Sequence, residues 1–362
     1  MTTAFDGMTV DHIELYVTDL AASRQWLGQG YGFGTHAMAD TPDGACSVAL
    51  GSGDIRMVLT EARTLDHPGA AYTEKHGDGV GRIGLRVADA TAAYNEAVRR
   101  GARPVIAPQA SDGIVTASIM AFGDVVHTFV ERAADLDERL LPGFTPVSAD
   151  GAAGTREPAP GMRAVDHFAV CLEAGTLDST VDFYERVLGF SMVFSERIVV
   201  GDQAMDSKVV QSASGAVTLT LIEPDLSREP GQIDAFIKNH DGAGVQHIAF
   251  AADDIVHAIG TMRGDGVAFL STPQTYYTLL TKRLELSRHT VDALSGLGVL
   301  VDEDHDGQLF QIFTRSVHPR GTLFMEVIER LGAKTFGSGN IKALYEAVEL
   351  QQAKNSEAGV PA

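Results

Sequence analysis

The sequence has few cysteines and no long apolar run. Its two cysteines, Cys46 and Cys171, lie far apart without Cys-x-x-Cys spacing, which excludes a disulfide framework and a thiolate metal site. No apolar stretch reaches the roughly 18 residues that a membrane span needs. The first residues, MTTAFDGMTVDHIEL, lack a basic segment followed by an apolar one, the pattern of a secretory signal. We therefore expect a cytoplasmic protein without a membrane partner.

Basic residues are also scarce. Lys and Arg number 28 against 48 Asp and Glu, so the 362-residue chain carries a formal net charge of −20. Such a charge repels nucleic acid, and no local basic cluster offsets it. The apolar share of 44% is ordinary for a protein that buries a sizeable core. These features favour a small-molecule substrate over a nucleic-acid partner, and we expect the chain to assemble as a homodimer.

An internal repeat organises what is present. Three segments of the first half recur in the second half in the same order, and they read as strand, amphipathic helix, a Gly-Phe step and further strands. The matched segments are VDHIELYVTDLAASRQWLGQGYGF (10–33) with VDHFAVCLEAGTLDSTVDFYERVLGF (165–190), IRMVLTEARTLDHPG (55–69) with VTLTLIEPDLSREPG (217–231), and GVGRIGLRVAD (79–89) with GVQHIAFAADD (244–254). Within each half the strand–helix–strands order occurs twice.

The repeat predicts the fold class. We expect an α+β protein of four βαβββ modules, paired into two half-barrel-like domains whose alternating strands give a concave inner face. The stretch PVSADGAAGTREPAPGM is rich in Gly, Ala and Pro and reads as a linker. The predicted parts are an N-terminal domain at 1–148, a linker at 149–162 and a C-terminal domain at 163–362. A final helix, IKALYEAVELQQ, is expected to cover the site.

Three apolar strands of the second half each carry one side chain that can bind a metal. They are His167 in VDHFAVC, His247 in GVQHIAF and Glu326 in FMEVIER. The matching positions in the first half are His12, Arg82 and Thr128, of which only the histidine could be a ligand. The modules therefore tolerate other residues at these positions, which makes the complete set in the second half informative.

Two imidazoles and one carboxylate on three strands of a cupped sheet would form a facial triad with open positions opposite. This arrangement suits non-heme Fe(II) and oxygen, although zinc could use the same ligands. Glu329 is a rival to Glu326, but a period of two places it on the opposite face. Its copy, Glu131, also occurs in the half without the full set. We predict His167, His247 and Glu326 as the metal ligands and catalytic residues.

These residues carry a resemblance to a known family. The order DHF, QHIAF, FMEVIER, followed by TFGSGNIKALYEAVE, resembles the 4-hydroxyphenylpyruvate dioxygenase family of the vicinal oxygen chelate superfamily, over nearly the whole chain and most strongly from 165 to 350. The resemblance implies Fe(II) as the cofactor, with 4-hydroxyphenylpyruvate and O2 as substrates. Two reactions share this scaffold: ring hydroxylation to homogentisate, and benzylic hydroxylation to 4-hydroxymandelate with release of CO2.

The chain departs from the usual dioxygenase pattern in the expected pocket. It has TLIEP (220–224) where that enzyme reads PINEP, and GNI (339–341) where it reads GNF. These changes resemble the branch that forms hydroxymandelate, so we expect oxidative decarboxylation and benzylic hydroxylation. The alternatives are the homogentisate-forming dioxygenase, a ring-cleaving catechol dioxygenase and, more remotely, a non-catalytic protein of the same fold that binds an aromatic ligand.

The resemblance also implies the substrate contacts. Polar side chains are expected to bind the substrate, Phe336 is placed to stack on its ring, and the branched Ile341 would leave the ring room to turn. The predicted substrate-binding residues are Ser207, Thr220, Ile222, Gln232, Gln311, Phe336, Asn340 and Ile341.

Overall fold

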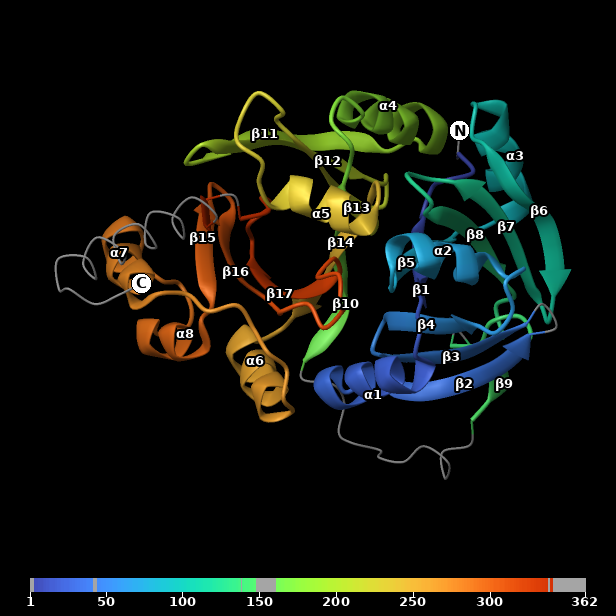
Figure 1. The fold of residues 1–362 in the computed structure, drawn as a ribbon, viewed down its shortest axis with the longest axis horizontal. Coiled ribbons are helices and arrows are strands. Elements are labelled where there is room, and N and C mark those ends of the chain that lie inside the picture. Colours follow the sequence, from blue (N-terminus) through green and yellow to red (C-terminus); the bar gives the residue numbers. More distant parts are fainter. Residues whose placement is uncertain (1–2, 42–43, 138, 148–160, 338, 341–362) are drawn as a thin grey trace.

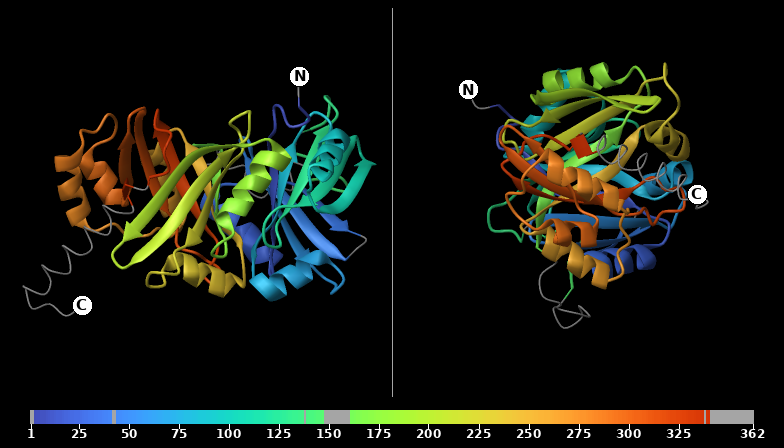
Figure 2. Two further views of the ribbon diagram at one scale, coloured as in Figure 1. Left: turned by 90° about the horizontal axis from the view of Figure 1, so that it is seen from above. Right: turned by 90° about the vertical axis from the view of Figure 1, so that its left-hand side faces the viewer.

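Two curled β-sheets lie side by side in the computed structural model, with helices packed against them (Figure 1). The structure describes residues 3–41, 44–137, 139–147, 161–337 and 339–340. Two perpendicular views show that the chain passes from one sheet to the other only after the first is complete (Figure 2). Within the described ranges no helix is long and apolar enough to cross a membrane.

The first sheet has nine strands in the order β6-β7-β8-β5-β1-β4-β3-β2-β9. Its strands are β1 (Thr9–Tyr16), β2 (Gly34–Thr41), β3 (Ala45–Ser52), β4 (Ile55–Ala62), β5 (Gly79–Arg86), β6 (Pro104–Ser111), β7 (Ile114–Met120), β8 (Val126–Arg132) and β9 (Thr145–Pro146). The helices are α1 (Leu20–Tyr31), α2 (Pro68–His76) and α3 (Ala90–Arg99).

The second sheet has eight strands in the order β11-β12-β13-β10-β14-β17-β16-β15. Its strands are β10 (Met162–Cys171), β11 (Ser191–Val200), β12 (Gln203–Gln211), β13 (Thr218–Pro224), β14 (Gly244–Ala252), β15 (Leu300–Asp304), β16 (Gly307–Phe313) and β17 (Phe324–Leu331). The helices are α4 (Leu177–Leu188), α5 (Gln232–His240), α6 (Ile255–Gly264), α7 (Gln274–Arg283) and α8 (Val291–Leu297).

The prediction of four βαβββ modules and an α+β fold is confirmed. Each sheet is built around an antiparallel pair, β1 with β5 and β10 with β14, and each of these strands has a parallel neighbour on its other side. The repeat did not reveal α2 and α5, which connect the modules, or α7 and α8, which are inserted in the fourth module. The predicted domain boundaries at 148 and 163 stay a prediction, because residues 148–160 lie outside the described ranges.

The repeated residues at the helix ends explain why the modules fold alike. Asp19, Asp89 and Asp254 precede α1, α3 and α6, and each carboxylate accepts a hydrogen bond from a backbone N–H of the first turn, as N-capping residues do. Gly32 and Gly189 end α1 and α4 with left-handed φ values of 68° and 69°. A glycine adopts this conformation at little cost, which accounts for the Gly-Phe step in both halves.

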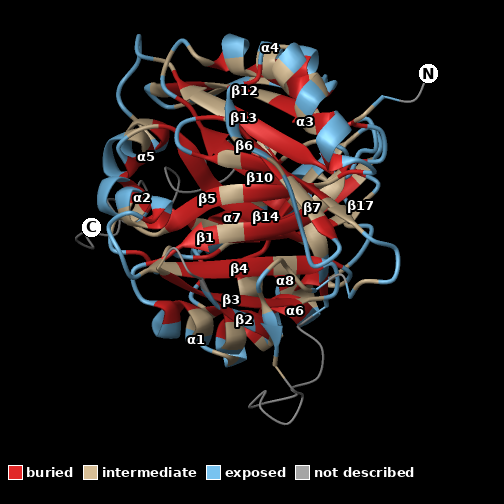
Figure 3. Cartoon of the chain, turned by 90° about the vertical axis from the view of Figure 1, so that its right-hand side faces the viewer, coloured by how far each residue is buried: buried red, intermediate tan, exposed pale blue. Residues whose placement is uncertain are grey.

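One apolar core joins the two sheets on their helix-covered sides. Phe250 of β14 packs against Phe33, with ring centroids 5.7 Å apart. His127 Nε2 of β8 lies 2.8 Å from Tyr184 Oη of α4. Figure 3 shows the central strands buried and the outer surfaces of the helices exposed. The opposite, inner face of each sheet is therefore the one available for polar chemistry.

Candidate metal centre

Three neighbouring strands place His167, His247 and Glu326 on one face of the second sheet. His167 of β10 pairs in register with Ala249 of β14, and Ala249 pairs with Glu326 of β17. Residues paired across strands point to the same face, as do residues two apart in one strand, so His247 joins them. The short distance between adjacent strands thus brings together side chains that are far apart in sequence.

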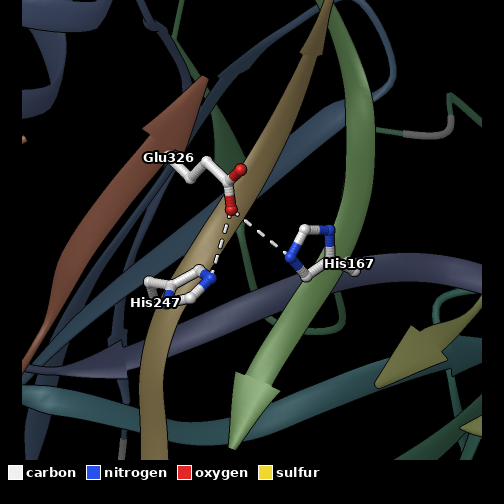
Figure 4. Close-up of side chains that lie close together, drawn as sticks. All are labelled: His167, His247 and Glu326. Atoms are coloured by element: carbon white, nitrogen blue, oxygen red, sulfur yellow. Dashed lines mark ion pairs between the residues drawn. The ribbon is translucent and has the colours of Figure 1, made fainter. Parts of the chain in front are cut away.

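The donor atoms of these residues converge. Glu326 Oε2 lies 3.3 Å from His167 Nε2 and 3.2 Å from His247 Nε2, with the carboxylate between the two imidazoles (Figure 4). The exposed fractions are 3%, 9% and 2% for His167, His247 and Glu326. Two ligands bound at right angles and about 2.1 Å from one metal ion are about 3 Å apart. The distances from the Glu326 oxygen to the two imidazole nitrogens therefore fit adjacent ligands of one ion.

Hydrogen bonds orient both imidazoles toward the centre. His167 Nδ1 lies 2.8 Å from Asp166 Oδ1, and His247 Nδ1 lies 3.3 Å from Gln246 Oε1. A histidine whose Nδ1–H donates to an acceptor presents the lone pair of Nε2, which is the usual second-shell arrangement of a metal-binding histidine. Both rings are thus oriented with Nε2 toward the centre.

The pKa values of the three groups reflect their close contact. Burial would raise the pKa of Glu326, but hydrogen bonds from His167 and His247 lower it well below its ordinary range. Burial disfavours a charged His167, yet hydrogen bonds to Asp166 and Glu326 raise its pKa to about 9. Burial also lowers the pKa of His247, and the hydrogen bond to the Glu326 carboxylate offsets this effect only in part. A cation at the centre would satisfy the ionised carboxylate.

Several predicted substrate contacts line the inner face with unsatisfied polar atoms. Thr220 pairs in register with Ala169, which pairs with His247, and Gln311 pairs with Ile328, two residues after Glu326. Within the part of the chain that the structure describes, Thr220 Oγ1, Gln311 Oε1 and Asn340 Nδ2 are buried and have no hydrogen-bond partner. Asn340 Oδ1 accepts a hydrogen bond from Tyr276 Oη at 2.8 Å. Buried polar groups are normally paired, so Thr220 Oγ1 and Gln311 Oε1 on the face of the triad indicate a polar ligand.

The other predicted residues fall in different surroundings. Ser207 is buried on β12 and pairs with Ile222, which faces the same side as Thr220. Ile222 packs with an apolar cluster that includes Ile233 and Phe236 of α5. Gln232 is the first residue of α5 and is exposed. Ile341 and the rest of the expected final helix lie outside the described residues.

Aromatic rings surround the triad. The Phe336 ring lies edge-on to His167, with centroids 5.2 Å apart. Phe313 and Phe324 flank His247 at 5.6 and 5.1 Å. Phe336 was predicted from the sequence, but Phe313 and Phe324 were not, because an aromatic residue on an apolar strand gives no signal that separates a pocket wall from the core.

The rival carboxylate, Glu329, points to the opposite face. Its Oε2 accepts a hydrogen bond from the Ile255 N–H at 2.8 Å and lies 2.9 Å from His289 Nε2. Its Oε1 forms an ion pair with Arg288 at 2.8 Å. A cation already neutralises this carboxylate, so we assign it to anchoring the start of α6.

The first sheet holds an arginine where the second has a metal ligand. Arg82 Nε lies 2.9 Å from Glu14 Oε2, and Arg82 Nη1 donates to Thr128 Oγ1 at 3.1 Å. Thr60 Oγ1 donates to Glu14 Oε1 at 2.6 Å. The inner face of the first sheet is therefore filled by a paired polar network, which explains why the first half can lack a ligand set.

Comparisons with known proteins agree with this architecture. The model of the Glyoxalase/Bleomycin resistance protein/Dioxygenase superfamily matches residues 9–124 and 164–312. The 4-hydroxyphenylpyruvate dioxygenase of Dictyostelium discoideum is 36% identical over 359 residues, which cover 94% of this chain and 97% of that protein. The enzyme of the same name from Neurospora crassa is 30% identical, with 95% and 91% covered.

A solved structure is also similar. A mutant of 4-hydroxymandelate synthase from Streptomyces coelicolor is 42% identical with a TM-score of 0.84, and the match covers 95% of this chain and 98% of that one. A xylose isomerase-like TIM barrel/4-hydroxyphenylpyruvate dioxygenase fusion protein is 25% identical with a TM-score of 0.75, covering 96% of this chain and 53% of that one.

Proposed function

The chain belongs to the 4-hydroxyphenylpyruvate dioxygenase family of the glyoxalase and dioxygenase superfamily, and from this premise we propose that it uses Fe(II) to form 4-hydroxymandelate and CO2. The substrates would be 4-hydroxyphenylpyruvate and O2. The observation that carries the proposal is the buried group of His167, His247 and Glu326, whose donor atoms lie within 4.8 Å of one another, on a face that also holds unpaired polar atoms.

The donor set fits the proposed metal. Two nitrogen donors and one oxygen donor approach from one side, both imidazoles are oriented through their Nδ1 atoms, and the donors are spaced as adjacent ligands require. His167, His247 and Glu326 would hold Fe(II) in a facial triad. When bound, the ion would supply the redox chemistry for oxidative decarboxylation of a 2-oxo acid and for hydroxylation by O2.

The protein's own residues would bind and orient the substrate. Thr220, Gln311 and Asn340 offer the unpaired polar atoms, which would hydrogen-bond to the polar groups of 4-hydroxyphenylpyruvate. Phe336 would stack on the aromatic ring. Phe313 and Phe324 form an apolar wall beside His247 that excludes water from the reacting atoms.

Orientation decides which carbon is hydroxylated. A displacement of about 1 Å at the reacting atoms can change a rate by about a hundredfold, so the position of the ring relative to the methylene selects the product. The sequence departs from the usual dioxygenase pattern at Thr220, Ile222 and Ile341, and Thr220 and Ile222 share the inner face. These positions support benzylic hydroxylation, as does the 42% identity to a hydroxymandelate synthase.

Product analysis tests this function. Iron-loaded protein is incubated with 4-hydroxyphenylpyruvate and O2, and oxygen uptake is recorded. Hydroxymandelate and homogentisate are isomers, so chromatography against both standards, followed by fragmentation, identifies the product. Hydroxymandelate is expected. Homogentisate would establish the alternative dioxygenase, turnover of catechols would favour ring cleavage, and absence of oxygen uptake in iron-loaded protein would favour the binding protein.

The homodimer and the cytoplasmic location stay predictions. Light scattering of the purified protein tests the first, since a monomer mass would contradict it. Fractionation of the source cells tests the second.

A further inference from the structure

One arginine connects the metal side of the site with the loop that carries Phe336. Arg330 Nε and Nη2 bind the two carboxylate oxygens of Asp166 at 2.8 and 2.9 Å. Asp166 in turn accepts the hydrogen bond from His167 Nδ1. A bidentate guanidinium–carboxylate pair fixes the orientation of both groups, so Arg330 holds the group that orients a candidate metal ligand.

The same guanidinium holds the loop. Arg330 Nη1 donates to the backbone oxygens of Ala333 at 3.2 Å and Thr335 at 2.6 Å. Its Cζ lies 5.0 Å from the centroid of the Phe336 ring, within the range of a cation–π contact. Phe336 itself touches the His167 ring. The contacts therefore form a closed circuit from Arg330 through Asp166, His167 and Phe336 back to Arg330.

The first half of the chain provides an internal comparison. Arg132 binds Asp11 with two contacts of 2.7 Å, and Asp11 lies 2.8 Å from His12 Nδ1. The Arg–Asp–His connection thus exists in a half without a ligand triad, so by itself it belongs to the architecture of the module. Among the described residues, no aromatic ring lies under the Arg132 guanidinium, and the side chain is 1% exposed against 21% for Arg330.

Arg132 Nη1 also donates to the backbone oxygen of Leu140, so what the second half adds is the guanidinium contact with Phe336, an aromatic ring that touches the candidate metal ligand His167. We propose that Arg330 is a positioning residue that transmits metal binding at His167 to residues 333–337, so that Phe336 is fixed over an aromatic substrate only when the metal site is formed. This proposal rests on the proposed function for the nature of the metal and the substrate. It does not depend on which carbon is hydroxylated.

A second carboxylate, Asp304, also holds the loop, which allows the loop contacts to be changed independently of the Asp166 contact. Asp304 Oδ2 accepts hydrogen bonds from the backbone N–H groups of Lys334 at 2.7 Å and Thr335 at 2.9 Å. A change at Asp304 therefore loosens the loop without touching Asp166. A change at Asp166 cuts the connection while the contacts of Arg330 to the loop remain.

The experiment measures amide hydrogen exchange of residues 333–337 with and without Co(II), and Co(II) affinity by calorimetry, without turnover. In the unaltered protein, Co(II) is expected to slow exchange of this segment. Arg330→Lys keeps the charge but loses the planar fork, so we expect it to abolish the Co(II)-dependent slowing. Because second-shell partners are worth about 10- to 100-fold in metal affinity, Co(II) affinity should fall about tenfold.

Three matched variants complete the test. Asp166→Asn should also abolish the Co(II)-dependent slowing, whereas Asp304→Asn should speed exchange in the metal-free protein and retain the slowing. Arg132→Lys makes the same change in the first half and should alter neither readout. Retained slowing in Arg330→Lys or Asp166→Asn, or an equal loss of Co(II) affinity in Arg132→Lys, would overturn the proposal. Neither readout requires turnover, so a different product would refute the proposed function and leave this inference standing.

Discussion

Replacing Thr220 with valine should stabilise the ligand-free protein and weaken substrate binding. Thr220 Oγ1 is buried without a partner among the described residues, and leaving such a group unpaired costs about 1–3 kcal/mol. Valine has nearly the same shape and lacks the hydroxyl. The first sheet already has this residue at the matching position, Val58, which pairs with Glu14 as Thr220 pairs with Ala169.

The expected magnitudes follow from these contacts. Thr220→Val should raise the free energy of unfolding of the metal-free protein by about 1 kcal/mol or more, measured by urea unfolding with an unchanged m value. A neutral hydrogen bond contributes about 0.5–1.5 kcal/mol. The dissociation constant for 4-hydroxyphenylpyruvate, titrated without oxygen into the metal-loaded protein, should therefore rise about two- to tenfold.

Thr60→Val is the matched control. The Thr60 hydroxyl donates to Glu14 at 2.6 Å and lies 2.9 Å from Ser47 Oγ, so its removal leaves Glu14 Oε1 and Ser47 without this partner, while Arg82 stays beside Glu14 Oε2. This variant should lose about 1–3 kcal/mol of stability and bind substrate normally. If Thr220→Val were destabilised to the same extent, or bound substrate as tightly as the unaltered protein, the Thr220 hydroxyl would not be held open for a ligand.

Three further predictions concern the junction between the sheets, the first sheet and the product. Burial lowers the pKa of His127 from 6.5 to about 4. As the pH falls, the histidine of the unfolded chain therefore takes up a proton before that of the folded protein does. The contribution of His127 to the free energy of unfolding is complete above pH 6.5 and is lost as the pH falls toward 4. The loss between pH 7 and 5 should be about 2 kcal/mol, and His127→Gln should remove that part of the pH dependence in urea unfolding, whereas an equal decline would contradict the assignment. The double change Arg82→His and Thr128→Glu would give the first sheet, together with His12, the same two imidazoles and one carboxylate as the second sheet. Bound Co(II), measured by elemental analysis, should then rise from one to two ions per chain, whereas the control Arg82→Met should keep one. A value of one for the double variant would contradict this expectation. Ile341→Phe should shift the product, identified by chromatography, toward homogentisate. An unchanged product ratio would show that Ile341 does not select the carbon that is hydroxylated.

The modules could be predicted from the sequence because the residues that begin and end their helices are themselves repeated. The capping Asp89 and Asp254 and the left-handed Gly32 and Gly189 are local signals with a fixed structural meaning, and each pair occupies matching places in the two halves. The helices α7 and α8 were missed because they occur once, so no second copy marked them as an insertion. α2 and α5 were missed although they are repeated, since each is only 9 residues long.

The candidate ligands were found because all three matching strands carry a metal-binding side chain in the second half, whereas only one of them does in the first half. Period-two alternation then distinguished Glu326 from Glu329, and the structure places Glu329 on the opposite face, paired with Arg288. Asp166 and Arg330 were overlooked, although the Asp-His and Glu-Arg pairs are repeated in both halves and were a usable signal. Their role depends on a contact between residues 164 positions apart, which one sequence does not reveal.

Anomalous diffraction at the iron absorption edge, from crystals prepared with Fe(II) without oxygen, would locate the metal ion relative to the three proposed ligands. We predict one iron peak per chain, within bonding distance of His167 Nε2, His247 Nε2 and a Glu326 carboxylate oxygen. A peak at other side chains, such as Asp254, His289 and Glu329, or no peak in protein shown to bind iron in solution, would contradict the account.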